Sequence, residues 1–168
     1  MSMKQRSKKE QFYMEVAEAM SMNNMRSFIN VDTLEVDLHS GEDHFFFEDV
    51  EDTAREAIEN PDKFLAIETL SSSESFNIME AFIETVKDKG LQRNLIRALE
   101  RKKPFANFKY IIDNSSIRQT WFQFRDNAYL NIAKEWVDEN ASNELKEKIK
   151  SLSSVVAIIT KNRSAGDE

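Results

Sequence analysis

The chain has 168 residues, no cysteine and a formal net charge of −7. This composition excludes disulfides and thiolate metal sites, and the acidic balance argues against nucleic-acid binding by the whole surface. The longest apolar run, Val155 to Ile159, is far shorter than the roughly 20 residues of a spanning helix, so no membrane contact is predicted. We expect a cytoplasmic protein with a single domain over residues 1–160 and a disordered tail over 161–168.

The first third of the chain predicts a helix and then a hairpin. Residues 8 to 23 place apolar side chains at helical spacing, namely Phe12, Val16, Ala19 and Met20. Thr33 to His39 alternates strictly between apolar and polar residues, which is typical of a half-buried strand. Met25 to Val31 can pair with that strand through a tight turn at Asp32-Thr33.

The middle of the chain predicts a helix, a strand and another helix. Residues 42 to 62 hold nine acids against one base, yet keep helical spacing up to Asn60-Pro61. Residues 64 to 68 then predict a short third strand. Ser71 and Glu74 have the spacing of a capping box, and the helix that they open is expected to end at Gly90.

The rest of the chain predicts four more helices. They cover residues 91–101, 104–113, about 117–140 and about 142–160, with Ser115 or Ser116 capping the third. Residues 155–160 are the part of the last helix for which a strand is the alternative. The predicted fold is therefore α+β and mainly helical, with an N-terminal helix, a small antiparallel sheet made of the hairpin plus the third strand, and an array of about five helices. In this array we expect Trp136 in the core and the apolar stripe of 143–160 to pack either on the chain itself or on a second copy.

A basic and aromatic segment stands out from the acidic background. Residues 97 to 125 contain seven bases and two acids, so the segment is +5 and the remainder of the chain is −12. As candidate ligand- or anion-binding residues we select the cations Lys102, Lys103, Lys109, Arg118 and Arg125, with the aromatic neighbours Phe105, Trp121, Phe122 and Tyr129.

Two interpretations of these residues stay open. Arg118 and Arg125 share an arc of the predicted 117–140 helix with aromatic rings, so they form either a structural ion pair or an anion clamp. We expect Arg125 to stack on Trp121, Phe122 or Tyr129 and to face Glu80 or Glu84. Lys102 and Lys103 either complement the end of one helix or hold an anion at the next, which opens at Pro104. The rings either stack on bases or belong to the core.

Motifs of known enzyme chemistry are not found. The three glycines are far apart, which excludes a phosphate-binding loop and a dinucleotide fingerprint. His39 and His44 lie close in sequence but lack a recognised ligand spacing, so neither a metal site nor a cofactor is predicted. No catalytic residue can be selected, and the pattern favours a noncatalytic protein.

Several motifs together resemble a bacterial uncharacterised protein family. They are Pro104-Phe105-Ala106-Asn107-Phe108-Lys109, Trp121-Phe122-Gln123-Phe124-Arg125 and Ala133-Lys134-Glu135-Trp136, in this order. The resemblance covers about residues 25 to 137. It implies a bacterial cytoplasmic protein and brings no catalytic residues with it. Many members carry two arginines where this chain has Ala106 and Asn107, which weakens an anion-binding role for that stretch.

Together these observations predict a noncatalytic cytoplasmic binding or protein-interaction module with its site at residues 97–125. The alternative is single-stranded nucleic-acid binding through the same segment. The expected partner is a protein or an anionic ligand, and the apolar stripe of residues 143–160 could support a homodimer.

Overall fold

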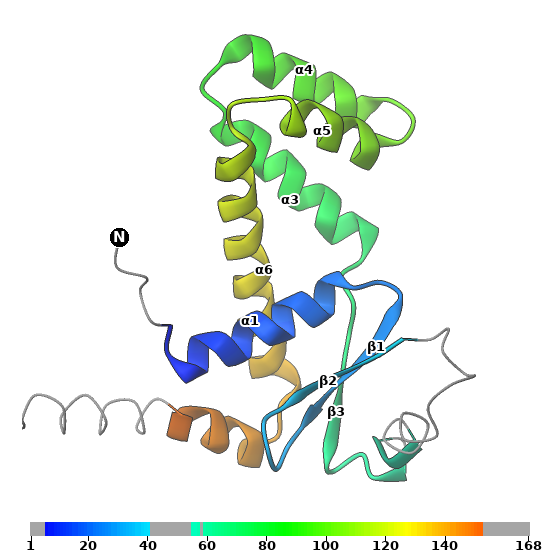
Figure 1. Cartoon of the computed structure of the whole chain (residues 1–168), viewed down its shortest axis with the longest axis vertical. Helices are drawn as coiled ribbons and strands as arrows, with labels where there is room; N and C mark the ends of the chain where they lie inside the picture. Colours follow the sequence, from blue (N-terminus) through cyan, green and yellow to red (C-terminus); the bar gives the residue numbers. More distant parts are fainter. Residues whose placement is uncertain (1–5, 41–54, 58, 153–168) are drawn as a thin grey trace, which may run out of the picture. The chain divides into compact units, whose positions relative to one another are not determined.

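The computed structural model describes residues 6–40, 55–57 and 59–152. Its elements are α1 Lys8–Ser21, β1 Met25–Asn30, β2 Val36–Ser40, β3 Phe64–Ile67, α3 Ser72–Thr85, α4 Lys89–Glu100, α5 Pro104–Asp113 and α6 Arg118–Asn140, and residues 143–152 form a further helix (Figure 1). This is the predicted α+β fold, mainly helical, with an N-terminal helix before a small antiparallel sheet. None of the described helices has both the length and the apolar character needed to span a membrane.

The chain divides into two compact units. Unit 1 takes in residues 1–69 and 130–168, and unit 2 takes in residues 70–129. The helix α6 contributes to both, because the division falls between Tyr129 and Leu130. The expected single domain over residues 1–160 stays a prediction, and the expected tail at 161–168 lies outside the described residues.

In unit 1, α1 packs against the sheet and contacts all three strands. Its predicted apolar residues are buried: Phe12, Val16, Ala19 and Met20. A capping box begins the helix, in which the Glu10 N–H donates to Ser7 Oγ over 3.2 Å and the Ser7 N–H donates to the Glu10 carboxylate over 3.4 Å. The same box satisfies free N–H groups that the first turn leaves without partners.

The sheet has the strand order β2-β1-β3 with both pairs antiparallel, as predicted. The hairpin loop is longer than the tight turn expected at Asp32-Thr33. It is closed by Asn30, whose N–H donates to the Glu35 carbonyl over 2.9 Å, and Leu34 takes a left-handed φ of 63°. The alternating segment predicted over Thr33 to His39 forms a strand only from Val36, and Leu38 on its apolar side is 41% exposed in the edge strand β2.

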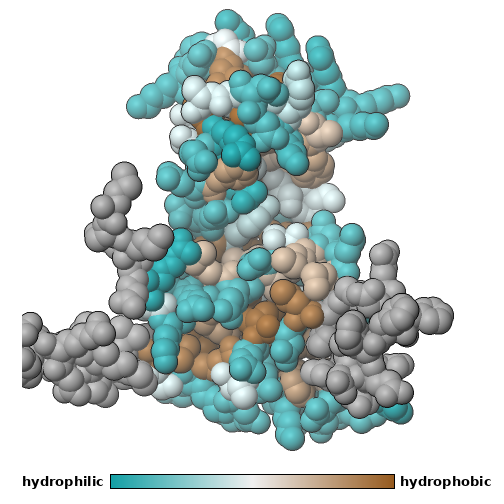
Figure 2. Space-filling view, viewed as in Figure 1, coloured by the Kyte–Doolittle hydropathy of each residue, from teal (hydrophilic) through white to brown (hydrophobic). Residues whose placement is uncertain are grey.

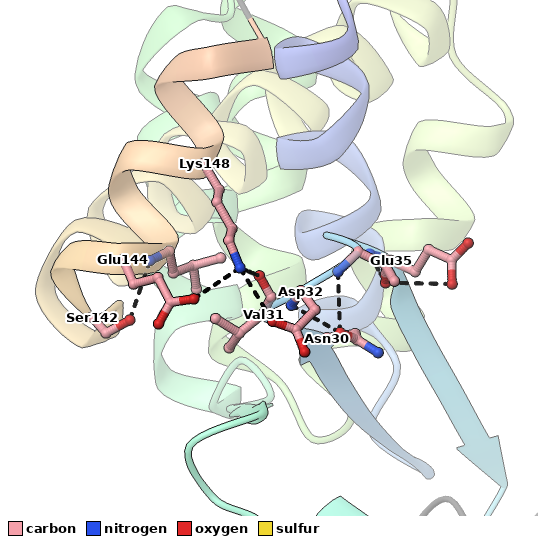
Figure 3. A network of polar contacts seen from close by, with 9 residues as sticks. Asn30, Val31, Asp32, Glu35, Ser142, Glu144 and Lys148 are labelled. Carbon is pink, nitrogen blue, oxygen red and sulfur yellow. Dashed lines mark hydrogen bonds and ion pairs between the residues drawn. The ribbon is translucent and has the colours of Figure 1, made fainter.

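The helix of residues 143–152 is tied to the hairpin loop by Lys148 (Figure 3). Its Nζ donates to the Val31 carbonyl over 3.0 Å, to Asp32 over 3.2 Å and to Glu144 over 2.9 Å. On the same helix Leu145 and Ile149 are buried within the chain. Leu145 and Ile149 therefore pack on the chain itself, which is one of the two partners expected for the 143–160 stripe. Residues 153–160 lie outside the described part.

Trp136 is buried, as predicted, and is only 8% exposed. Ala133 and Val137 of the same stretch of α6 are buried with it. The indole N–H finds no acceptor among the described residues. The Trp136 side chain therefore contributes packing to unit 1 rather than hydrogen bonding.

Unit 2 has its own hydrophobic core, centred on Phe82 of α3. The core joins buried residues of α3, α4 and α5 to Trp121 and Phe124 of α6. The Phe82 ring, which is 1% exposed, meets the rings of Phe108, Trp121 and Phe124 edge-on at centroid distances of 6.4, 5.1 and 5.3 Å. The predicted capping box of α3 is present, with Glu74 N–H donating to Ser71 Oγ over 3.1 Å.

The expected helix end at Gly90 is wrong. α3 already ends at Thr85, and Gly90 lies inside α4 with a negative φ. Asp88 explains the difference, since its side chain caps α4 by accepting from the Leu91 N–H over 3.0 Å. Gln92 then donates to the Ile83 carbonyl over 2.9 Å and so satisfies the end of the preceding helix.

Candidate cationic surface

One face of α4 carries a row of cations. They recur at every fourth residue and therefore lie on one side of the helix: Lys89, Arg93, Arg97 and Arg101, the last at the C-cap. All four are exposed. The other side of the helix packs into the core of unit 2 through Leu91, Leu95 and Leu99. Burial of the leucine face thus fixes which way the cations point.

The turn between α4 and α5 adds two more cations. Lys102 and Lys103 are exposed, and Lys103 has a left-handed φ of 61° before Pro104 begins α5. Asn107 holds the turn, because its side-chain amide donates to the Lys102 carbonyl over 2.9 Å and its N–H donates to the Lys103 carbonyl over 3.1 Å. Lys109 follows on α5 and is also exposed.

These seven residues form what we call the cationic α4–α5 surface: Lys89, Arg93, Arg97, Arg101, Lys102, Lys103 and Lys109. Within the described residues no carboxylate forms an ion pair with any of them. Unit 2 contains two ion pairs, and both belong to α6 arginines. The candidate residues selected from the sequence include none of the four α4 cations, and Lys89 and Arg93 lie outside the predicted segment 97–125. The signal that would have included them is the repeat of one cation every four residues from Lys89 to Arg101.

Apolar side chains are exposed in the same part of unit 2. Ile96 of α4 and Phe105 of α5 are each 43% exposed, and Tyr110 of α5 is 72% exposed. Figure 2 shows long hydrophilic side chains at the α4–α5 end of the view with hydrophobic residues between them. Phe105 is partly held by an edge contact with Phe76 at a centroid distance of 6.5 Å. The surface thus combines positive charge with apolar contact area.

On α6, cations and rings alternate along a second stripe. Arg118 and Arg125 place their guanidinium carbons 4.6 and 4.9 Å from the centre of the Phe122 ring, and Arg125 also lies 5.8 Å from the Tyr129 ring. Arg118 pairs with Asp113 at the end of α5 over 3.2 Å, and Arg125 pairs with Asp126 over 3.0 Å. Each arginine therefore has a carboxylate of its own, and the two share the Phe122 ring.

The expected stacking of Arg125 is confirmed for Phe122 and Tyr129, but its expected acid is wrong. The carboxylate is that of Asp126 rather than that of Glu80 or Glu84. Trp121 is not a stacking partner either, because its ring lies 4.7 Å from Phe108 in the core. The acid next to Arg125 on the same helical turn forms the ion pair, in place of an acid on another helix.

The pKa of the Tyr129 hydroxyl depends on burial and on its neighbours in this stripe. Burial raises the pKa of its hydroxyl, Arg125 lowers that pKa, Asp126 raises it, and a hydrogen bond with Ser75 lowers it. The burial effect is the largest of the four. The phenol is therefore neutral at physiological pH and acts as a stacking and hydrogen-bonding group.

The structure divides the predicted site into two parts. Lys102, Lys103, Lys109 and Phe105 belong to the α4–α5 hairpin, whereas Arg118, Arg125, Phe122 and Tyr129 belong to α6. Among the described residues no ion pair, hydrogen bond or ring contact joins the two groups. Trp121 belongs to the core. No cluster of three metal-ligating side chains occurs within the described ranges, and His44 lies outside them.

Comparison with known proteins places the chain in a family. The model of the Uncharacterised protein family (UPF0158) matches residues 29–157. The chain belongs to this family. A relative of the chain is the UPF0158 protein PA5073 of Pseudomonas aeruginosa, which is 28% identical over 108 residues covering 62% of this chain and 71% of the relative. No solved structure matches this UPF0158 chain.

Proposed function

We propose that the chain is a noncatalytic cytoplasmic binding module and that its cationic α4–α5 surface recognises an acidic protein. The observation that carries the proposal is the set of seven exposed cations that have no carboxylate partner among the described residues. Cations that recur along one helix face repel one another, and an anionic partner relieves that repulsion. In a chain with a net charge of −7, this local excess is a feature of the surface and not of the bulk composition.

The backbone of Lys103 supports the same proposal. A non-glycine residue in the left-handed region is disfavoured by roughly 1 kcal/mol or more, and glycine would fit there without strain. The lysine keeps this conformation in a turn that Asn107 holds from both sides. A non-glycine side chain at a strained backbone position suits a role in binding.

Ile96 favours a protein over a nucleic acid as the partner. It lies on α4 beside the row of cations and is 43% exposed. An aliphatic side chain has no stacking interaction to offer a base, whereas protein interfaces combine apolar contacts with arginine and tyrosine anchors. Arg93 and Arg97 on α4 and the exposed Tyr110 on α5 supply those residue types in unit 2.

Single-stranded nucleic acid is the second candidate. Tyr110 is the observation that favours it, because its ring is 72% exposed and follows Lys109 directly in sequence. Base stacking on an exposed ring contributes about 1 to 3 kcal/mol per base, and neighbouring lysines would neutralise phosphates. Phe105, close to Lys102 and Lys103 in sequence, offers a second ring.

Fluorescence anisotropy with two labelled probes separates the candidates. One probe is a glutamate-rich helical peptide and the other is an oligouridylate of equal charge, and each is titrated at low and at physiological salt. The test variant is Arg93→Glu/Arg97→Glu, which reverses two exposed charges on α4. The matched control is Lys8→Glu/Lys63→Glu, which reverses two exposed charges of unit 1.

The proposal requires saturable peptide binding that the test variant abolishes and the control variant preserves. If the oligouridylate binds more tightly, loses affinity steeply with salt and depends on Tyr110, the second candidate is correct instead. If binding falls equally in both variants, it depends on the net charge of the protein and not on the cationic α4–α5 surface. If neither probe binds at low salt, both candidates fail.

A further inference from the structure

A pocket in unit 1 is separate from the cationic α4–α5 surface. It has a volume of about 110 Å³ and lies among α1, the part of α6 in unit 1 and the helix of residues 143–152. Val137 and Ile149, both buried, form its apolar lining. One water takes up about 30 Å³ of liquid and a cavity of about 150 Å³ holds benzene, so this volume suits a compact ion or a small polar group.

Three lysines line the pocket against one acid. Lys9 comes from the first turn of α1, Lys146 and Lys150 come from the helix of residues 143–152, and the acid is Asp138 of α6. Lys150 pairs with Glu147 over 3.1 Å. Lys9 and Lys146 are each half-buried and make no ion pair with any described residue. Half-buried ammonium groups without an anion leave a local positive charge uncompensated.

Tyr13 adds an unused hydrogen-bonding group to the same pocket. Its side chain is only 7% exposed, lines the pocket and has no hydrogen bond to a described residue. Burial raises the pKa of this hydroxyl, and the negative charge of Asp138 raises it further. The hydroxyl therefore keeps its proton at physiological pH and is available as a donor.

We infer that this pocket binds a phosphoryl dianion. The net charge of the lining groups is +2, the volume suits a tetrahedral anion, and lysine ammonium groups and a tyrosine hydroxyl are donors that phosphate oxygens accept. The dianion can be free inorganic phosphate or the phosphate group of a larger molecule. In either form the phosphate oxygens accept from Lys9, Lys146 and Tyr13, and Val137 and Ile149 shield one side from water.

The three tyrosines of the chain make the inference testable in one experiment. Tyr13 lines the pocket, Tyr110 lies on α5 beside Lys109, and Tyr129 lies on α6 in unit 2. With ring-labelled tyrosine, NMR follows all three while inorganic phosphate, phosphoserine or glycerol phosphate is added at constant ionic strength. Chloride and acetate titrations measure the effect of simple anions, and Tyr13→Phe assigns the Tyr13 signal.

We expect inorganic phosphate to shift the Tyr13 signal saturably and to leave Tyr129 unchanged, with a Kd in roughly the millimolar range. Lys146→Gln should weaken this binding about tenfold, whereas Lys63→Gln, an exposed lysine of unit 1 away from the pocket, should not change it. Tighter binding of phosphoserine or glycerol phosphate would identify the phosphate ester as the ligand. The inference is wrong if Tyr13 responds equally to chloride, if its shift does not saturate, or if Lys146→Gln has no effect.

Discussion

Phe82→Ala should destabilise unit 2 by about 4 to 5 kcal/mol. The ring is 1% exposed, and a buried Phe→Ala change costs about 3 to 5 kcal/mol from lost transfer energy and the cavity left behind. Three edge-on ring contacts, with Phe108, Trp121 and Phe124, are lost as well, and each aromatic pair contributes about 0.5 to 1.5 kcal/mol. These contacts place the loss at the upper end of the range.

Phe105→Ala is the matched control because it removes the same atoms from a surface position. Phe105 is 43% exposed and has one ring contact, with Phe76 at 6.5 Å. Its loss should therefore be about 1 kcal/mol. Urea unfolding followed by tryptophan fluorescence measures both variants. Equal losses for Phe82→Ala and Phe105→Ala would refute the assignment of Phe82 to the centre of this core.

The two tryptophans allow the two units to be followed separately. Trp121 reports on unit 2 in a Trp136→Phe background, and Trp136 reports on unit 1 in a Trp121→Phe background. Trp136→Phe should be mild, because the indole N–H has no acceptor among the described residues. We expect Phe82→Ala to shift both transitions together, since α6 runs through both units and the chain is predicted to be one domain. Unfolding of unit 2 alone would contradict that prediction.

Three further changes test individual contacts. Lys148→Met should destabilise the protein at neutral pH. The Glu144 and Asp32 carboxylates raise the pKa of Lys148, so the stability difference from wild type should persist until the pH rises through that raised pKa. Urea titrations at a series of pH values measure this difference. Arg125→Ala should cost about 1 kcal/mol, because its ion pair is at the surface, and it should raise the pKa of Tyr129 in an ultraviolet titration; an unchanged pKa would contradict the contact. Ser27→Ala should be neutral or slightly stabilising by thermal unfolding, because the buried hydroxyl has no partner among the described residues.

The features that sequence predicted best are those determined within a few residues. Helical spacing placed Phe12 and Val16 of α1 correctly, and Ser71 with Glu74 gave the start of α3, because these patterns involve contacts one turn apart. The strand pairing of the hairpin followed from two short apolar segments and the loop between them. None of these required knowledge of the rest of the chain.

The wrong predictions concern choices between competing partners. Glycine at position 90 favours a helix end, but the Asp88 side chain caps a new helix that already includes Gly90. Leu38 belongs to an alternating segment, but its strand lies at the edge of the sheet and has a neighbouring strand on one side only, so Leu38 is exposed. Arg125 was expected to face Glu80 or Glu84 of another helix, but it pairs with Asp126 next to it in sequence. Spacing gives the candidates in such cases, and three-dimensional packing selects among them.

The same distinction separates structural cations from candidate binding cations. Arg118 and Arg125 entered the predicted site with the lysines because all are basic and lie within one segment. Each arginine has its own carboxylate and shares the Phe122 ring, so much of its hydrogen-bonding and stacking capacity is used within the protein. Lys102 and Lys103 have neither kind of partner among the described residues. An anion that approaches the lysines displaces only water, whereas one that approaches the arginines must compete with a carboxylate already in place. This difference is the reason that the proposed site is the cationic α4–α5 surface rather than α6.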